Sequence, residues 1–234
     1  MRVLVTRPEP DSQATAERLR ALGHDVVRDP LLIIEPIADA TLPPGRFDAV
    51  VLTSVNGARA LAQRPELAAL RDLPLYAVGR RTEAVAPPGF SRRLVAGGNG
   101  AALAALLRAE LSPGSRVLHV CGEERAVDLG AELAGDGHAV ALFTIYRARA
   151  ADHLLPATEA AIRGRQIDAA FHFSPRTAAT LARLARQAGL TEHGAGFVHL
   201  CFSANVAAPL VQAGWPTRIA DEPTEDGLFA LLST

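Results

Sequence analysis

Val3-Leu4-Val5-Thr6-Arg7, near the start of the chain, and Val117-Leu118-His119-Val120-Cys121, halfway along it, share one strand pattern. Each apolar run precedes a helical segment that ends in glycine and histidine, Gly23-His24 in one copy and Gly137-His138 in the other. Glycine is a common residue just after a helix, and the apolar residues that follow begin another strand. The pattern predicts a β–α–β segment that occurs twice.

The repeat continues beyond these segments, in the same order in both halves of the chain. The further matches pair Phe47–Ser54 with Ile167–Ser174, Ala77–Ala84 with Leu200–Ala207, and Gly98–Leu103 with Glu225–Ala230. In this alignment Phe202 stands opposite Gly79, and Asn205 opposite Thr82. We therefore expect the chain to contain two copies of one α/β pattern.

Strands and helices are expected to alternate along the whole chain. The expected strands are residues 3–5, 24–27, 31–37, 47–52, 75–78, 93–95, 116–120, 139–146, 168–173, 197–202 and 217–219. The expected helices are residues 10–22, 56–63, 80–85, 100–111, 125–134, 155–163, 177–187, 206–213 and 225–232. Such alternation predicts parallel sheets covered by helices on both faces, and the number of strands requires more than one sheet.

The composition excludes several classes of protein. The 234 residues are 49% apolar and 21% charged, with a formal net charge of −1, which does not favour a basic nucleic-acid surface. Two distant cysteines, Cys121 and Cys201, predict neither a disulfide framework nor a structural metal site, and suit a reducing compartment. No apolar run suits a signal peptide or a membrane span, so we expect a cytoplasmic protein.

Polar residues and glycines follow most of the expected strands. They include Thr6-Arg7, Thr53-Ser54-Val55-Asn56, Gly79-Arg80-Arg81-Thr82, Gly97-Gly98-Asn99-Gly100, Gly122-Glu123, Ser174-Pro175-Arg176-Thr177 and Ser203-Ala204-Asn205. Taken singly, the hydroxyl and amide side chains are explained by helix capping. Taken together with the arginines, they predict an anion-binding edge, because helix N-termini and strand ends meet at that edge of a parallel sheet.

Familiar catalytic motifs are missing from the sequence. It contains no GxSxG, HExxH, P-loop or GxGxxG pattern. His119 and His172 fall on expected strands, where packing or a structural hydrogen bond is the favoured interpretation. Tyr146 ends an expected strand and, by itself, suits an interface aromatic residue with a hydrated hydroxyl. The motifs alone therefore identify no catalytic group.

Several segments together resemble the uroporphyrinogen-III synthase family over essentially the whole chain. Their joint order and spacing carry the resemblance, because each motif alone is weak. The segments are Leu4–Pro8, Pro30–Pro36, Asp48–Asn56, Ala77–Thr82, Val117–Glu123, Ile145–Arg147 and Phe173–Thr177.

The resemblance implies an α/β fold of two flavodoxin-like lobes with parallel sheets, joined by a two-strand linker, with the active-site cleft between the lobes. The first lobe would be discontinuous and contain residues 1–34 and 150–234. The second lobe would contain residues 38–142, and the linker strands residues 31–37 and 143–149. Each lobe would thus combine segments from both copies of the repeat.

The resemblance also implies a reaction without cofactor or metal. Enzymes of the family convert hydroxymethylbilane, a linear tetrapyrrole with acetate and propionate arms on every ring, into uroporphyrinogen III. They expel the terminal hydroxyl, invert the last ring through a spiro intermediate and close the macrocycle. The expected protein is a monomeric hydro-lyase of tetrapyrrole biosynthesis. Its partners would be this small molecule and, in a handover, hydroxymethylbilane synthase, but neither nucleic acid nor a membrane.

By position, the resemblance assigns Tyr146 and Thr82 to catalysis, with Tyr146 as the proton donor or hydrogen-bond partner of the leaving hydroxyl. Substrate binding would fall to residues whose amides or side chains can meet carboxylates. These are Thr6, Arg7, Ser54, Asn56, Gly79, Arg80, Gly122, Glu123, Ser174, Arg176, Ser203 and Asn205. In the second copy, Phe202 and Asn205 replace the family's glycine and threonine, and Phe202 would prevent a close backbone approach.

Two other functions are open at this point. A non-catalytic two-lobed module could bind a tetrapyrrole or another polycarboxylate at the same edge, with saturable binding and no formation of isomer III. A nucleotide-dependent transferase of flavodoxin-like fold is the weaker alternative, because the sequence lacks a phosphate-binding motif.

Overall fold

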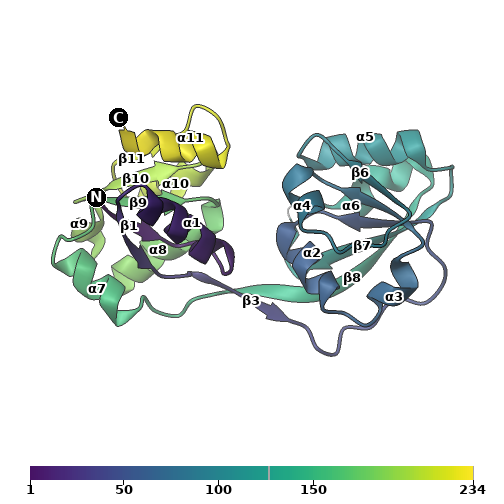
Figure 1. Cartoon of the computed structure of the whole chain (residues 1–234), viewed down its shortest axis with the longest axis horizontal. Helices are drawn as coiled ribbons and strands as arrows, with labels where there is room; N and C mark the ends of the chain where they lie inside the picture. The colour runs from purple at the N-terminus through teal and green to yellow at the C-terminus, as the bar shows by residue number, and fades with distance from the viewer. Residues whose placement is uncertain (126, 234) are drawn as a thin grey trace. The chain divides into compact units, whose positions relative to one another are not determined.

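The computed structural model describes residues 1–125 and 127–233, and tertiary contacts divide the chain into two compact units. The first unit comprises Met1–Ile33 with Arg149–Thr234, and the second comprises Ile34–Ala148. The chain passes between the units twice, in the paired strands β3 (Leu32–Pro36) and β8 (Ala139–Ala150) (Figure 1). Main-chain hydrogen bonds from Ile37 to Ile145 and from Ala151 to Leu31 show that the two segments run antiparallel.

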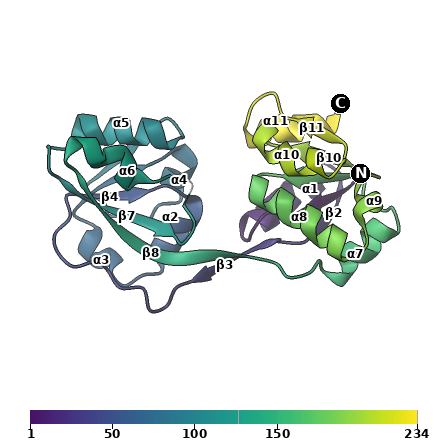
Figure 2. The same cartoon turned by 180° about the vertical axis from the view of Figure 1, so that it is seen from behind.

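The first unit is a parallel five-stranded sheet in the order β2-β1-β9-β10-β11. Its strands are β1 (Arg2–Val5), β2 (Asp25–Arg28), β9 (Ala169–His172), β10 (Val198–Cys201) and β11 (Thr217–Ile219). Its helices are α1 (Asp11–Ala21), α7 (Pro156–Arg163), α8 (Pro175–Gln187), α9 (Thr191–Gly194), α10 (Ala204–Gln212), α11 (Glu225–Ala230) and the short 3₁₀ turn η2 (Leu231–Ser233). Figure 2 shows α7 and α8 over one face of this sheet.

The second unit contains a six-stranded sheet in the order β3-β8-β7-β4-β5-β6. Its remaining strands are β4 (Ala49–Leu52), β5 (Pro74–Ala77), β6 (Arg92–Val95) and β7 (Arg116–Gly122). Its helices are α2 (Val55–Ala62), α3 (Leu67–Leu70), α4 (Arg80–Ala84), α5 (Gly100–Glu110), α6 (Leu129–Leu133) and the 3₁₀ turn η1 (Ala134–Asp136). From β8 to β6 the neighbouring strands are parallel.

The sequence repeat explains why the two sheets have the same strand order. One copy supplies β1, β2, β4, β5 and β6, and the other supplies β7 to β11. The linker strand β3 is an additional strand at the edge of the second sheet. Without it, and numbered within a copy, the strands of both sheets run second, first, third, fourth, fifth, which is the flavodoxin-like order. Each unit takes its first two strands from one copy and its last three from the other. The predicted fold class, two α/β lobes built on parallel sheets, is confirmed.

Strand pairing corrects one part of the repeat alignment. Leu52 pairs with Ala77 in one sheet and His172 pairs with Cys201 in the other, so Ala77 corresponds to Cys201 and Gly79 to Ser203. The expectations that Phe202 replaces Gly79 and that Asn205 replaces Thr82 are each wrong by one residue, because Thr82 corresponds to Val206. The apolar runs alone do not specify that register, whereas the hydrogen bonds of the sheet do.

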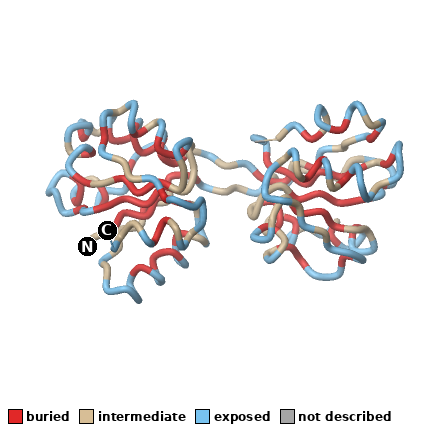
Figure 3. Tube along the Cα trace, turned by 90° about the horizontal axis from the view of Figure 1, so that it is seen from above, coloured by how far each residue is buried: buried red, intermediate tan, exposed pale blue. Residues whose placement is uncertain are grey.

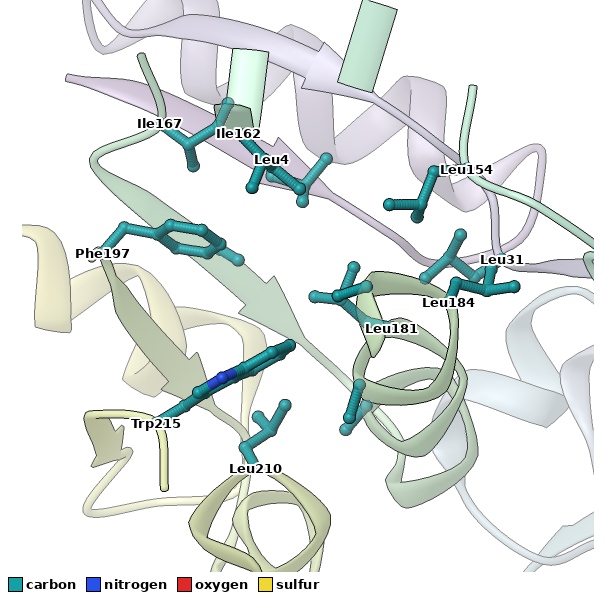
Figure 4. Close-up of a cluster of buried hydrophobic side chains, with 14 of the residues drawn as sticks. Leu4, Leu31, Leu154, Ile162, Ile167, Leu181, Leu184, Phe197, Leu210 and Trp215 are labelled. Carbon is teal, nitrogen blue, oxygen red and sulfur yellow. The ribbon is translucent and has the colours of Figure 1, made fainter. Parts of the chain in front are cut away.

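The buried cores lie on both faces of each sheet, because successive strand residues point to opposite faces. In the first unit, Val3 and Val5 pack against α1 and α11, whereas Leu4 packs in the cluster that contains residues of α7, α8 and α10. Figure 4 shows this second cluster, with Trp215 and Leu210 beside Leu181. Burying each such leucine stabilises the fold by about 2 kcal/mol. Figure 3 shows the buried residues concentrated along the central strands of each unit.

Some predicted elements differ from those observed. The helix expected at residues 125–134 is shorter, since α6 covers Leu129–Leu133, and residue 126 lies outside the described residues. The expected strand 139–146 and linker strand 143–149 are one continuous strand, β8. The single-turn helices α3 and α9 were not expected, because four residues carry too little periodicity. In the described part of the chain, no helix combines the length and the apolar character needed to cross a membrane.

Candidate functional site

The predicted site residues lie on two edges, one in each unit, where the carboxyl ends of the parallel strands meet. The carboxyl edge of the first unit carries Thr6, Arg7, Ser174, Arg176, Ser203 and Asn205. The carboxyl edge of the second unit carries Ser54, Asn56, Gly79, Arg80, Thr82, Gly122, Glu123 and Tyr146. Both predicted catalytic residues therefore belong to the second unit.

A hydroxyl pair forms the centre of the edge in the second unit. The Tyr146 hydroxyl lies 2.8 Å from Oγ of Ser54, and the tyrosine is only 8% exposed. Ser54 is the N-cap of α2, and its Oγ accepts the Gly57 N–H at 2.9 Å. One serine hydroxyl thus caps a helix and bonds a buried phenol that the sequence places 92 residues away.

Gly122 makes room for the Tyr146 ring, and Gly57 occupies a tight space beside Ser54. Gly122 pairs with Tyr146 across β7 and β8, beside an irregularity in the strand register between Cys121 and Gly122. A Cβ atom at Gly122 would lie 2.7 Å from Cζ of Tyr146, closer than van der Waals contact allows. A Cβ atom at Gly57 would lie 3.1 Å from Oγ of Ser54 and 3.2 Å from the carbonyl oxygen of Val120. Gly122, predicted to bind substrate, therefore also provides the space that the tyrosine ring occupies. Gly57, which was not among the predicted site residues, provides space beside Ser54.

Burial keeps the Tyr146 hydroxyl protonated. Desolvation raises the pKa of this phenol above its ordinary value of 10.0, and the hydrogen bond with Ser54 lowers it by a smaller amount. At neutral pH, Tyr146 is therefore an uncharged O–H donor in a largely dry environment. The main chain holds it in place as well, because the Glu123 N–H donates to the Tyr146 carbonyl oxygen at 3.0 Å.

A glycine-lined hollow of about 530 Å³ lies at the ends of β5 and β6. Its lining includes Gly79, Arg80 and the pair Gly97-Gly98. The backbone segments approach closely, since a Cβ atom at Gly79 would lie 3.4 Å from Cα of Gly98. The Arg80 side chain is exposed beside this hollow, whereas Thr82 is buried within α4. Cationic and main-chain N–H groups together suit a carboxylate.

The remaining predicted residues of the second unit lie farther toward solvent. Asn56, in the first turn of α2, is half-buried. The Glu123 side chain is exposed just beyond β7. A carboxylate at this edge would repel an anionic ligand, and the Glu123 N–H already donates to the Tyr146 carbonyl oxygen. Neither group of Glu123 therefore suits the predicted contact with a substrate carboxylate.

In the first unit, Thr6 and Arg7 are buried among protein groups. The Arg7 guanidinium is bonded to Asp11 at 3.1 Å and to Glu225 at 2.7 Å, and it stacks on the Phe173 ring at 3.9 Å. The Thr6 hydroxyl donates to the carbonyl oxygen of Phe171. These contacts explain both residues structurally, and their substrate contacts remain predictions.

The other predicted residues of the first unit are more accessible. Ser174 and Arg176 are half-buried at the start of α8, and Ser174 Oγ accepts the Thr177 N–H at 3.2 Å. Ser203 is the N-cap residue of α10, with φ −164° and ψ 169°, and Asn205 is exposed in the first turn of that helix. Gly79 has nearly the same backbone conformation, φ −165° and ψ 168°, at the start of α4. At the start of this helix, the backbone geometry is therefore nearly the same in both units.

Buried histidines form structural hydrogen bonds, as expected for His119 and His172. Nε2 of His119 lies 2.9 Å from Oγ1 of Thr53. Nε2 of His172 lies 2.9 Å from Nδ1 of His199, whose Nε2 lies 2.9 Å from the Gly194 carbonyl oxygen. Because a carbonyl only accepts, His199 donates to Gly194 and His172 donates to His199. Burial lowers the pKa of His119 and of His199 to about 4, and that of His172 well below 6.5.

Comparison with known proteins adds independent information. The family model described as uroporphyrinogen-III synthase HemD (HEM4) matches residues 13–230. Uroporphyrinogen-III synthetase from Helicobacter pylori 26695 is structurally similar, with a TM-score of 0.65, 18% identity and coverage of 100% of this chain and 99% of that chain. A mutant uroporphyrinogen III synthase from the extremely thermophilic bacterium Thermus thermophilus gives a TM-score of 0.58, 19% identity and coverage of 100% and 96%. No curated protein sequence matches the chain.

Proposed function

Since the chain belongs to the uroporphyrinogen-III synthase family, we propose that it cyclises hydroxymethylbilane to uroporphyrinogen III, with inversion of the last ring and loss of water. The observation that carries the chemical part of this proposal is the buried, neutral Tyr146 hydroxyl held at the carboxyl edge of the second unit. Loss of the substrate's terminal hydroxyl requires a proton, and Tyr146 can supply one while, being neutral before the transfer, it does not repel the polyanion as it binds.

The pyrrole rings of the substrate supply the electrons for the reaction. Electron density from a ring nitrogen expels the terminal hydroxyl, and a carbon of another ring then attacks the resulting electrophilic carbon. The protein's proposed task is to fold the linear tetrapyrrole, hold its carboxylates and assist departure of the hydroxyl. No protein nucleophile is needed in this scheme.

Carboxylate binding is the second part of the proposal. In the second unit, the Arg80 guanidinium and main-chain N–H groups of the Gly79–Thr82 segment would bind acetate or propionate arms, whereas the Gly98 N–H already donates to the Val78 carbonyl oxygen. In the first unit, Ser174, Arg176, Ser203 and Asn205 would offer comparable groups. Arginine binds carboxylates well because its planar guanidinium donates two parallel hydrogen bonds.

Tyr146→Phe is expected to lower turnover from several-fold to a few tens-fold, because positioning supplies most of the catalysis. The ring and its packing on Gly122 are retained in this variant, so the folded state should persist. The rate of isomer III formation from hydroxymethylbilane provides the measurement. Complete loss of that activity in a folded variant would contradict the expectation and make Tyr146 indispensable.

A further inference from the structure

The two copies of the repeat use the same serine differently. Ser54 and Ser174 occupy equivalent places at the ends of β4 and β9, and each caps the following helix. Ser174 Oγ lies 2.9 Å from the hydroxyl of Thr177, its neighbour in the same helix. Ser54 Oγ instead lies 2.8 Å from the hydroxyl of Tyr146, in another strand. The helix cap is common to both copies, but the phenol contact belongs to one.

Two differences in sequence account for this divergence, and the first is that the first unit contains no tyrosine. The second lies in the helix that follows the serine. The residue three places after the serine is Thr177 in the first unit and Gly57 in the second. Without a side chain at Gly57, no neighbouring hydroxyl in that helix turn competes for Ser54. Gly57 also adjoins the tyrosine, since a Cβ atom there would lie in van der Waals contact with Cε1 of Tyr146, at 3.7 Å.

The hydrogen-bond capacity of Ser54 determines what it can do for Tyr146. A serine hydroxyl has one proton and two lone pairs, and the Gly57 N–H occupies one lone pair. The serine proton can then be donated to the phenol oxygen, which leaves the phenol proton available to a ligand. The N–H bond from the positive end of α2 strengthens the serine as a donor.

We propose that Ser54 is a positioning residue of the reaction, which holds the Tyr146 hydroxyl and donates a hydrogen bond to its oxygen while the Tyr146 proton is transferred. The inference rests on the proposed function of Tyr146 and gives Ser54 a role other than direct substrate binding. When the terminal C–O bond breaks, the electron pair stays on the departing oxygen, and the Tyr146 proton joins it to form water.

The negative charge left on Tyr146 is neutralised later in the same reaction. The phenolate that remains on Tyr146 keeps the hydrogen bond donated by Ser54. The pyrrole ring that forms the new carbon–carbon bond loses a proton as it becomes aromatic again. That proton restores the phenol, so neither an oxidant nor any other co-reactant is consumed.

A kinetic cycle tests the proposal through turnover of hydroxymethylbilane. Ser54→Ala is expected to lower kcat about tenfold with little change in KM, because it weakens proton transfer without removing a carboxylate contact. Ser54→Thr keeps both the hydroxyl and the cap and should restore most of kcat. In a Tyr146→Phe background, Ser54→Ala should cause little further loss. A loss that is additive, or one confined to KM, would overturn the proposal.

A spectroscopic titration tests the same contact without relying on activity. The chain has two tyrosines, so in Tyr76→Phe protein the tyrosinate absorbance reports Tyr146 alone. Ser54→Ala should move its titration midpoint upward by about one pH unit, because the phenolate loses a hydrogen bond. An unchanged midpoint would contradict the proposal. If no isomer III forms but the midpoint moves, the proposed function fails and the Ser54–Tyr146 coupling stands.

The matched control for helix capping is Thr224→Ala. Thr224 caps α11, and its Oγ1 accepts the N–H of Gly227 three residues on, as Ser54 does with Gly57. The variant should lower the urea unfolding midpoint about as much as Ser54→Ala does, because each loses one helix cap. It should leave both kcat and the Tyr146 titration unchanged. A similar loss of kcat in Thr224→Ala would assign the Ser54 effect to stability alone.

Discussion

Gly122→Ala is expected to lower turnover about 100-fold, a larger loss than that of Tyr146→Phe. The added methyl carbon would lie 2.7 Å from Cζ and 3.1 Å from the hydroxyl oxygen of Tyr146, so the ring must move. The displaced ring loses its contact with Ser54 and occupies space at the carboxyl edge. Overpacking of this kind also costs about 1–3 kcal/mol of folding stability. Steady-state kinetics and urea unfolding measure the two effects separately.

Gly135→Ala provides the control in the same unit, because a Cβ atom there would meet no neighbouring atom within 4 Å. Its turnover should match that of the wild type. The double variant Gly122→Ala/Tyr146→Phe should be no slower than Gly122→Ala alone, because both changes remove the same hydroxyl from its place. If folded Gly122→Ala keeps turnover within about twofold of wild type, Tyr146 is not positioned for catalysis as proposed.

The stability of the first unit is expected to fall as the pH is lowered from about 7.5 to about 5. His199 has a pKa of about 4 in the folded protein, against 6.5 in the unfolded chain, and the pKa of His172 is also well below 6.5. Below pH 6.5 the unfolded chain therefore binds protons that the folded unit does not, and unfolding becomes easier. Above about pH 7.5 the histidines are neutral in both states, and the effect vanishes. Between the unfolded-state pKa of His199 and pH 4, this residue alone should lower the free energy of unfolding by on the order of 3 kcal/mol.

Trp215 makes this change measurable. It is the chain's single tryptophan and stacks on His199 with ring centroids 4.8 Å apart. Urea unfolding followed by its fluorescence should give a midpoint that decreases steadily below pH 6.5. Asp29, whose pKa is raised mainly by burial, acts in the opposite direction, so the measured fall in the midpoint understates the contribution of the histidines.

His172→Gln is the matched variant for this pH effect. It keeps an N–H donor toward His199 while it removes one titrating group. The fall in stability below pH 6.5 should therefore be shallower in the variant. A midpoint that stays constant between about pH 7.5 and about pH 5 in the wild type would contradict the prediction that the histidines are buried and neutral.

The arrangement of strands could largely be predicted from the sequence. Apolar runs such as Val3–Val5 and Ala49–Leu52 define central strands, because both faces of a parallel sheet are covered by helices. The exchange of segments between the two units followed only from the family resemblance. A repeat of this kind is compatible with two independent halves as well as with two interleaved units.

The contacts within the candidate site could not be predicted in the same way. The bond between Ser54 and Tyr146 depends on the register of β7, β8 and β4, including the irregularity at Cys121 and Gly122. Likewise, no local pattern near Arg7 indicates that Glu225 would neutralise it. One usable signal was present, because the repeat places Gly57 opposite Thr177 and thus marks where the two copies diverge.

The isomer of uroporphyrinogen formed from hydroxymethylbilane tests the central claim most directly. Without an enzyme, the linear tetrapyrrole closes to isomer I, which retains the original orientation of the last ring. With the wild-type protein, we expect isomer III to be the main product, detected after oxidation to porphyrins and separation of the isomers. Formation of isomer I alone, together with saturable binding of the tetrapyrrole, would contradict the proposed activity and identify a binding module instead.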